Sequence, residues 1–334
     1  MVTCSLTTLC YLEKDDQYLM MHRVKKVNDI NKDKWIGAGG HAEEYESPED
    51  CLLREIKEEL GVELTEYHFR GLITFCLLGK ETQYMCLYTA TAWKGELASD
   101  CNEGNLEWIS KDKIPNLPLW KGDLVFFELL RKNQPFFSLK LTYDHDDTLI
   151  SCNLDGKEIM DTYTIEKADY ADVEKIYALE QTAYEQMPVK EWYVTDDIPF
   201  LERHIDREGF ILKAVSAFGE LAGFLVVRYP KEASDNLFHD IKEIYNLSDE
   251  EMLYTAHMES TAVSVKHRGH HLQEKLVLEG MRLAALDGYR HFCATVHPDN
   301  KYSRRSGDAA GFCCVCEKEK YGGLRRCIYY KKLT

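Results

Sequence analysis

The sequence has no long apolar stretch and no low-complexity segment. A membrane-crossing helix takes about 20 consecutive apolar residues, and every apolar run in these 334 residues stops well short of that length. The N-terminus also lacks a basic leader followed by an apolar core and a small-residue cleavage site. These absences predict a cytoplasmic protein without a membrane partner.

Basic residues are fewer than acidic residues in this chain. The chain has 41 Lys and Arg residues against 57 Asp and Glu residues, which gives a formal net charge of −16. A general binder of nucleic-acid polymers needs a basic stripe, so the composition excludes that class. It does not exclude nucleotides, because a bound metal ion can supply positive charge locally.

A paired zinc pattern is also missing. Of the twelve cysteines, only Cys313 and Cys316 form a C-x-x-C, and several others lie in apolar, strand-like runs such as residues 3–12 and 73–78. One such pair without a second is a weak zinc signal. We therefore predict reduced thiols and interpret Cys313 and Cys316 as strand residues.

The length is large for one domain and suits two. We predict domains at residues 1–157 and 158–334, both of the α/β (α+β) class. The first half reads as an α/β/α sandwich, with helices near 48–60 and 117–130 and strands near 3–12, 18–23, 67–78, 83–93, 106–109, 136–143 and 148–153. The second reads as a mixed sheet flanked by helices near 169–186 and 272–286, with strands near 163–168, 210–216, 221–229, 254–265, 291–296, 312–316 and 325–331.

The most informative stretch is residues 40–62, GHAEEYESPEDCLLREIKEELGV. Ser47 is a good N-cap, Pro48 suits the first helical position, and Asp50 completes a capping box. Gly61 ends the helix where a left-handed residue is wanted. Three carboxylates then share one helix face, because their positions are i, i+3 and i+4: Glu55, Glu58 and Glu59.

On its own, this cluster could be a solvated acidic face of a surface helix. A Gly-Gly turn before the helix, Arg54 directly ahead of Glu55, and Glu46 at a fixed distance upstream change the interpretation. Together these residues match the Nudix box at every defining position, including Ile56 and Val62. The first half therefore resembles the Nudix hydrolases.

The resemblance implies a pyrophosphohydrolase that acts on a nucleoside diphosphate linked to a further group and requires Mg²⁺ or Mn²⁺. Hard divalent cations favour oxygen ligands and bridge to substrate phosphates. The implied metal ligands are Glu55, Glu58, Glu59 and the carbonyl of Gly39, with Glu103 as a further carboxylate or a surface loop acid. Glu58 or Glu59 could act as the base, and Arg54 is expected to orient Glu46 or Glu58.

Within the family, the sequence is similar to the oxidised purine nucleoside triphosphate diphosphatases, the 8-oxo-dGTP diphosphatase type. Trp35 and Trp120 lie in the segments that carry this similarity. Trp120 could stack on a purine or anchor the following helix in the core, and Asp123 could bind the edge of the base. Ile36 departs from the asparagine that animal members place there, so base selectivity could be broader or achieved differently.

Residues 162–332 resemble the GNAT acyltransferases, which use acetyl-CoA. The diagnostic run is SVKHRGHHLQ (264–273), a strand end followed by a loop that opens a helix. Backbone N–H groups of such a loop can bind the CoA pyrophosphate. The implied cofactor-binding residues are Val265, Arg268, Gly269, His270, His271, Leu272, Gln273, Asn300 and Ser303. Tyr302 could protonate the departing thiolate, and Glu259 could accept the amine proton or be a sheet-edge acid.

One position departs from the GNAT pattern. His271 stands where the family usually has glycine, and a side chain there can force the loop out of its positive-φ conformation. The second half could thus be a CoA-binding or interaction module without turnover. His267, His270 and His271 could also be metal ligands, although no acid or cysteine partner accompanies them.

The sequence thus predicts a bifunctional enzyme with a nucleoside triphosphate substrate and an acetyl acceptor amine that cannot be identified. A competing hypothesis is one hydrolase activity with a non-catalytic second domain, and another is a Nudix hydrolase of a CoA derivative. The oligomeric state is not predicted.

Overall fold

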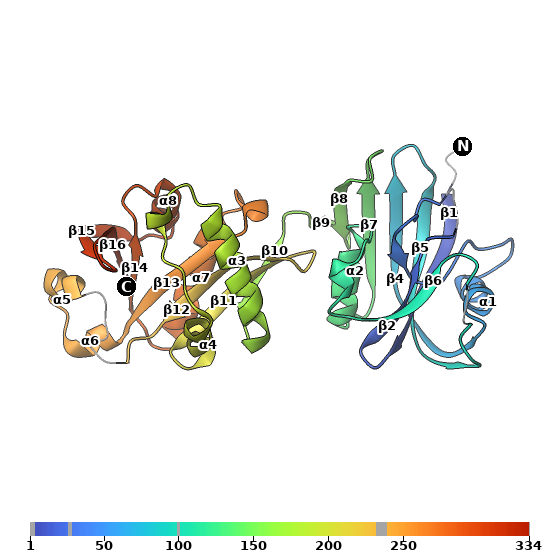
Figure 1. Ribbon diagram of the computed structural model, residues 1–334, viewed down its shortest axis with the longest axis horizontal. Helices are drawn as coiled ribbons and strands as arrows, with labels where there is room; N and C mark the ends of the chain where they lie inside the picture. The colour runs from blue at the N-terminus through green and yellow to red at the C-terminus, as the bar shows by residue number, and fades with distance from the viewer. Residues whose placement is uncertain (1–3, 26–28, 99–100, 232–238, 334) are drawn as a thin grey trace. The chain divides into compact units, whose positions relative to one another are not determined.

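The computed structural model describes residues 4–25, 29–98, 101–231 and 239–333. The chain forms two compact units, Met1–Asp161 with Ala217–Gly219 and Thr162–Ser216 with Glu220–Thr334. Each unit contains a mixed sheet flanked by helices, which confirms the predicted fold class (Figure 1). The predicted boundary between residues 157 and 158 stays a prediction. Within the described ranges, no helix is long and apolar enough to cross a membrane.

The sheet of the first unit has the strand order β3-β2-β1-β5-β4-β7-β8-β9, and β6 pairs with β2. The β1–β5 and β4–β7 pairs are parallel, whereas the other pairs are antiparallel. The strands are β1 (Cys4–Lys14), β2 (Gln17–His22), β3 (Trp35–Ile36), β4 (Glu63–Leu77), β5 (Thr82–Lys94), β6 (Asn105–Ser110), β7 (Phe137–Tyr143), β8 (Leu149–Leu154) and β9 (Lys157–Glu158).

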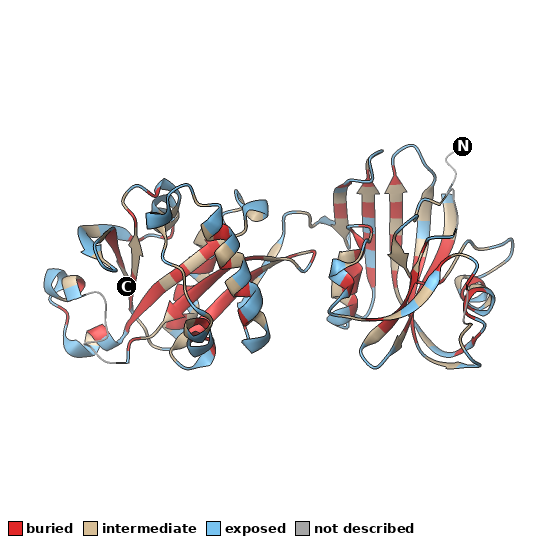
Figure 2. Ribbon diagram, in the orientation of Figure 1, coloured by how far each residue is buried: buried red, intermediate tan, exposed pale blue. Residues whose placement is uncertain are grey.

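Strand β1 is buried on both faces in its middle, whereas buried residues alternate with partly buried ones along the second half of β4; Figure 2 shows red mixed with tan and pale blue along these strands. Successive side chains of a strand point to opposite faces. In β1, Leu9 and Tyr11 join the core beneath α2 (Asp123–Arg131), whereas Cys10 and Leu12 join the core beneath α1 (Pro48–Leu60). The two helices therefore cover opposite faces of the sheet.

The sheet of the second unit has the order β10-β11-β12-β13-β14-β16-β15. Only β13 and β14 pair in parallel among these neighbours in the described part of the unit. The strands are β10 (Tyr163–Lys167), β11 (Gly209–Ser216), β12 (Leu221–Arg228), β13 (Thr255–Val263), β14 (His291–Val296), β15 (Cys313–Lys320) and β16 (Leu324–Lys332), and the helices are α3 (Val173–Glu185), α4 (Ile198–Asp206), α5 (His239–Tyr245), α6 (Asp249–Leu253), α7 (Leu272–Leu286) and α8 (Lys301–Ala309).

Some elements differ from the predictions. The helix predicted at 117–130 begins only at Asp123; Pro118 disfavours a helical conformation at Leu117, and residues 118–122 form a bend and turn before the helix. The helix predicted at 169–186 is a 3-10 turn, Tyr170–Asp172, followed by α3. Helices α4 and α8 were not predicted. Cys313 and Cys316 lie on β15, which confirms their interpretation as strand residues, and all twelve cysteines are free thiols.

Candidate functional site

The carboxylate helix α1 has the end signals that the sequence predicts. Ser47 caps it through a hydrogen bond from the Asp50 N–H to Ser47 Oγ (3.1 Å), and Asp50 Oδ2 accepts the Ser47 N–H (3.0 Å). Gly61 ends the helix in the left-handed region at φ 75°. These caps fix where α1 begins and ends, and the burial of Leu52, Ile56 and Leu60 in the core fixes which way its glutamates face.

The glycine turn ahead of α1 lies against β1. The Thr8 N–H donates to the Gly40 carbonyl (2.9 Å), and Cys10 exchanges two backbone hydrogen bonds with Ala38 (2.7 and 3.0 Å). Gly39 has a φ of 147°, and a Cβ there would lie 2.2 Å from the Thr8 carbonyl oxygen. A Cβ on Gly40 would lie 2.3 Å from Oε1 of Glu55. Only glycine lets this backbone approach both β1 and the α1 carboxylates.

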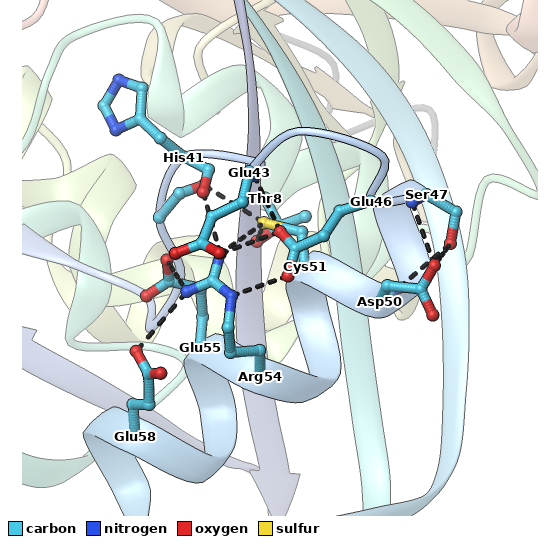
Figure 3. Close-up of polar contacts among 11 residues, drawn as sticks. Thr8, His41, Glu43, Glu46, Ser47, Asp50, Cys51, Arg54, Glu55 and Glu58 are labelled. Carbon is cyan, nitrogen blue, oxygen red and sulfur yellow. Dashed lines mark hydrogen bonds and ion pairs between the residues drawn. The ribbon is translucent and has the colours of Figure 1, made fainter.

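Arg54 is the centre of a carboxylate network (Figure 3). Its Nε and Nη2 donate to the two oxygens of Glu46 (2.7 and 2.9 Å), and Nη1 donates to Glu55 Oε1 (2.8 Å) and more weakly to Glu58 Oε2 (3.4 Å). Nη2 also donates to the carbonyl of His41 (3.0 Å). Hydrogen bonding to Arg54 lowers the pKa of Glu46 to about 2. Arg54 thus orients the carboxylates.

Two glutamates of the predicted metal set, Glu58 and Glu59, differ in burial. Glu58 is 61% exposed at its side chain, whereas Glu59 is buried and accepts the Gly39 N–H at Oε2 (2.9 Å). Burial raises the pKa of Glu59 to about 8, and the negative charges of Glu103 and Glu55 act in the same direction. Arg23 forms an ion pair with Glu103.

These residues fit a divalent cation. Their carboxylates and the carbonyl oxygens of the glycine turn form the all-oxygen donor set that Mg²⁺ and Mn²⁺ favour. A cation would also relieve the like-charge repulsion that raises the pKa of Glu59. Among the residues that the structure describes, no three acidic, imidazole or thiol groups form a ready cage, since Arg54 engages Glu55 and Arg23 engages Glu103.

The predicted base-binding residues lie on β3, in the segment before α2 and at the start of α2. Trp120 is only 4% exposed, and its indole N–H donates to Asn31 Oδ1 (2.8 Å). Its ring packs edge-on against Phe75 and Tyr143, and Lys34 Nζ lies 4.3 Å from its centroid. Trp120 therefore belongs to the core, as the alternative interpretation of the sequence has it.

Trp35 and Asp123 are placed differently from Trp120. Trp35 is half-buried and stacks on His22 (4.7 Å between centroids), while its backbone N–H donates to the Pro118 carbonyl (2.9 Å). Its neighbour Ile36 is half-buried on β3. Asp123 is buried at the start of α2, and burial raises its pKa to about 8 although the positive charge of Lys34 opposes this. A buried, protonated carboxyl group can donate a hydrogen bond.

The loop before α7 keeps a left-handed backbone. Gly269 has a φ of 89°, and His271, which stands at the N-cap, has a φ of 57°. The expectation that a side chain at 271 distorts this conformation is therefore wrong, because histidine is among the residues that tolerate the left-handed region. The His271 side chain does not cap α7. The first N–H groups of α7, including those of Leu272 and Gln273, thus have no acceptor within the helix.

The rest of this loop is exposed or packs against neighbouring side chains of the second unit. Val265 belongs to a 3-10 turn, Val265–His267, and both Val265 and Arg268 are exposed. The ring of His270 lies 5.4 Å from that of Tyr163. His267 contacts Glu220 (Nε2 to Oε2, 3.2 Å). No metal-ligating group of three residues occurs here in the described chain.

A cavity of about 210 Å³ lies where the second sheet opens. β13 and β14 pair only from Thr255–His257 to His291–Cys293, and the following residues of both strands line the cavity. Opposite β12, Glu259 and Ser260 both face the single residue Val226, since Leu225 pairs with Thr261 and Val227 with Met258. This bulge re-aims Glu259 and Ser260.

Four of the predicted second-site residues meet in this cavity: Glu259, Gln273, Asn300 and Ser303. Asn300 caps α8 by accepting the Ser303 N–H (3.2 Å), and its Nδ2 donates to Ser303 Oγ (3.1 Å). Burial alone would raise the pKa of Glu259, but His257 and Arg228 lower it below its ordinary value. Tyr302 is 77% exposed on α8 and does not line the cavity.

Several further residues line this cavity although the sequence assigned them no role there: Trp192, Tyr193, Asp196, Tyr321 and Arg326. Trp192, Tyr193 and Asp196 come from the segment between α3 and α4, to which no pattern assigned a role. Arg326 did carry a signal, because an arginine inside the otherwise apolar β16 is a charged residue at a buried strand position.

Comparison with known proteins gives a family match for the first half of the chain. Residues 5–130 match the NUDIX domain family. An oxidized purine nucleoside triphosphate hydrolase of Mus musculus is 30% identical over 122 residues, 36% of this chain and 77% of the relative. A Nudix hydrolase of Bacillus subtilis is 28% identical over 156 residues, 46% of this chain and 95% of the relative.

Two solved structures are similar to different parts of the chain. The MutT protein of Bacillus halodurans has a TM-score of 0.41 at 26% identity, covering 46% of this chain and 99% of its own. A GNAT-family acetyltransferase of Listeria monocytogenes has a TM-score of 0.40 at 17% identity, covering 53% of this chain and 96% of its own. With its complete helix motif and its mouse relative, the chain belongs to the Nudix family, and it is a hydrolase of acid anhydrides.

Proposed function

We propose that the first unit hydrolyses oxidised purine nucleoside triphosphates, converting 8-oxo-dGTP to 8-oxo-dGMP and pyrophosphate. The relatives from mouse and Danio rerio, at 30% and 29% identity, are oxidized purine nucleoside triphosphate hydrolases. The observation that carries the proposal is the buried carboxyl of Glu59, held against the glycine turn with Glu55 and Glu103 as charged neighbours. A buried carboxyl group beside other acidic residues suits a reaction in which a cation and the substrate phosphates meet at one site.

Mg²⁺ or Mn²⁺ would be held by carboxylates of Glu55, Glu58, Glu59 and Glu103 and by the Gly39 carbonyl. A cation held there would supply positive charge for the phosphates and a more acidic water for attack on phosphorus. Glu58 or Glu59 would accept the proton of the attacking water. Arg54 would keep Glu46, Glu55 and Glu58 in register through its hydrogen bonds.

Recognition of the base would depend on Asp123, with Trp35 and Ile36 as neighbouring contacts. The raised pKa of Asp123 leaves its carboxyl largely protonated at neutral pH, so it can donate to an acceptor on the purine edge and accept from a donor beside it. From the core, Trp120 would support this arrangement by holding Lys34, whose Nζ lies over the indole ring and whose charge acts on Asp123.

Substrate profiling of the purified chain with Mg²⁺ tests this proposal. We expect the highest kcat/KM for 8-oxo-dGTP, compared with dGTP, nucleotide sugars and dinucleoside polyphosphates. Glu58→Gln or Glu59→Gln should lower kcat by about 10²- to 10⁴-fold, whereas the control Glu63→Gln changes only an exposed ion pair with Lys57. A preference for nucleotide sugars or dinucleoside polyphosphates would contradict the proposal.

For the second unit, we propose transfer of an acetyl group from acetyl-CoA to an amine. The separation of β13 from β14 carries this proposal, because it leaves main-chain groups that an extended pantetheine arm could bind. Backbone N–H groups of residues 268–273 would bind the pyrophosphate at the N-terminus of α7. Asn300 and Ser303 would contact the arm.

Proton transfer in this unit would use two residues of the cavity. Glu259 would take the proton from the acceptor amine, directly or through water. For the departing thiolate, Tyr321 replaces the exposed Tyr302 as the proposed donor, because Tyr321 lines the cavity and its hydroxyl lies 3.1 Å from Thr295 Oγ1.

Calorimetry with acetyl-CoA tests the second activity. Binding heat supports the cofactor site, and no heat at high ligand concentration rules out the transferase. Glu58→Gln and Glu59→Gln should lower hydrolysis by the factor given above and leave acetyl transfer intact, because the two sites lie in different units. Loss of both activities together would contradict two independent sites.

A further inference from the structure

The cavity between β13 and β14 contains charges of both signs. Asp196 and Glu259 contribute carboxylates, and Arg326 contributes a guanidinium. Among the described residues, neither carboxylate lies within 4.0 Å ion-pair distance of Arg326. The cavity therefore keeps separated positive and negative groups in a small volume of about 210 Å³.

Arg326 is a buried cation with few partners. Arg326 is 3% exposed, and its Nη1 donates a hydrogen bond to the backbone carbonyl of Arg325 (2.8 Å). It lies over the Tyr321 ring at 5.5 Å. Burial lowers the pKa of Arg326, although Tyr321 and Glu191 oppose this. A guanidinium has five N–H donors, and burying a charge without a counter-charge is costly.

Asp196 is the complementary group. Its Oδ2 is buried without a hydrogen-bond partner, although the residue lines the cavity. Burial raises the pKa of Asp196 to about 7, a hydrogen bond from Ser260 to the carboxyl group lowers it, and the nearby charge of Glu259 acts in the same direction as burial. An orphaned carboxylate oxygen beside a second carboxylate is a site where an ammonium group would supply the missing donor.

We propose that the acceptor of the second unit is a small zwitterion with a primary amine and a carboxylate, of the α-amino-acid class. Arg326 would bind the acceptor's carboxylate, and Asp196 with Glu259 would bind its ammonium group. A bidentate guanidinium–carboxylate pair gives both affinity and orientation.

This inference rests on the acetyl-transfer function proposed above. The acceptor's ammonium group loses one proton to Glu259, and its nitrogen forms a C–N bond with the thioester carbonyl carbon. The C–S bond breaks, and the thiolate takes a proton from Tyr321. The nitrogen loses its second proton as the amide forms, and this proton replaces the one that Tyr321 gave to the thiolate. The products are the N-acetylated acceptor, CoA and one proton, which leaves Glu259 for solvent.

Thiol release from acetyl-CoA, measured with the full-length protein, tests the proposal. The acceptors are the twenty standard amino acids, each compared with its amide and its decarboxylated amine. We expect turnover with at least one amino acid, and little with its amide or amine. Arg326→Gln should raise KM for that amino acid by about 10- to 100-fold. Arg326→Lys should recover it in part, and KM for acetyl-CoA should not change.

Arg325→Gln is the matched control, because its exposed side chain pairs with Glu317 (2.6 Å) away from the cavity lining. Calorimetry with acetyl-CoA distinguishes failure of the acetyl-transfer function from failure of the zwitterion proposal. A protein that binds no acetyl-CoA contradicts the acetyl-transfer function itself. If acetyl-CoA binds but amines and amides react as well as amino acids, the zwitterion proposal is overturned. Binding without turnover, and without thermal stabilisation by any amino acid in the presence of CoA, also overturns it.

Discussion

Arg54 binds the carboxylate of Glu46 through two parallel hydrogen bonds, of 2.7 Å from Nε and 2.9 Å from Nη2. The residues are eight positions apart, one in the loop before α1 and one on the helix. This fork ties the loop to the face that carries Glu55 and Glu58.

Arg54→Lys should therefore lower hydrolysis without unfolding the chain. Lysine keeps the charge but cannot reproduce the two parallel bonds, so Glu55 and Glu58 lose their orientation. We expect kcat/KM to fall about 10- to 100-fold. The control Arg282→Lys removes a similar fork to Glu279 on α7. Equal losses in both variants would contradict an orienting role for Arg54.

Gly39→Ala should destabilise the first unit more than Gly156→Ala. Gly156, at φ 79°, is near the left-handed helical region, which costs alanine about 1–2 kcal/mol, whereas Gly39, at φ 147°, lies beyond that region in a conformation that L side chains rarely adopt. Only at Gly39 would the new Cβ also meet backbone, 2.2 Å from the Thr8 carbonyl oxygen. Scanning calorimetry of the full chain measures the difference, and equal shifts in the two variants would show that close packing against β1 is unimportant.

Asp123→Asn should change the pH dependence of stability. The folded protein holds a proton on Asp123 up to about pH 8, whereas the unfolded carboxyl loses it near its ordinary pKa of 3.8. The folded state thus binds more protons between these values, so this group's contribution to stability falls as pH rises through that window and stays level above it.

We expect Asp123→Asn to remove this part of the slope of unfolding temperature against pH. The control Asp146→Asn alters an exposed turn residue and should leave the slope unchanged. The same Asp123 variant should lower kcat/KM for 8-oxo-dGTP by about 10- to 100-fold, the value of a hydrogen bond to a polar partner. An unaltered slope would show that the carboxyl is already ionised in the folded protein.

His271→Val should weaken acetyl-CoA binding, whereas His271→Gly should preserve it. Both variants lose the contact of His271 Nδ1 with Glu274 (3.5 Å), so the comparison isolates the backbone. Valine is β-branched and disfavours the φ of 57° found at this N-cap, which should lower affinity about tenfold. Calorimetry measures the affinities, and equal binding by both variants would show that the left-handed backbone is not required.

The sequence by itself determined the local features of the first site. Ser47, Pro48 and Gly61 specify the ends of α1 through backbone hydrogen bonding and φ, and the i, i+3, i+4 spacing places the glutamates on one face. Such rules act over a few residues, so they can be read without knowing the fold. The tolerance of His271 for positive φ was not anticipated, because one side chain alone does not reveal how its loop is supported.

The tertiary structure decided how distant residues combine. Burial separates Glu59 from Glu58, one position away, and it places Trp120 in the core rather than on an open surface. The divergence of β13 from β14 brings Asp196 and Arg326, 130 positions apart in the printed numbering, to one cavity. Burial and strand pairing depend on the whole sheet, and neither property is encoded within a short segment.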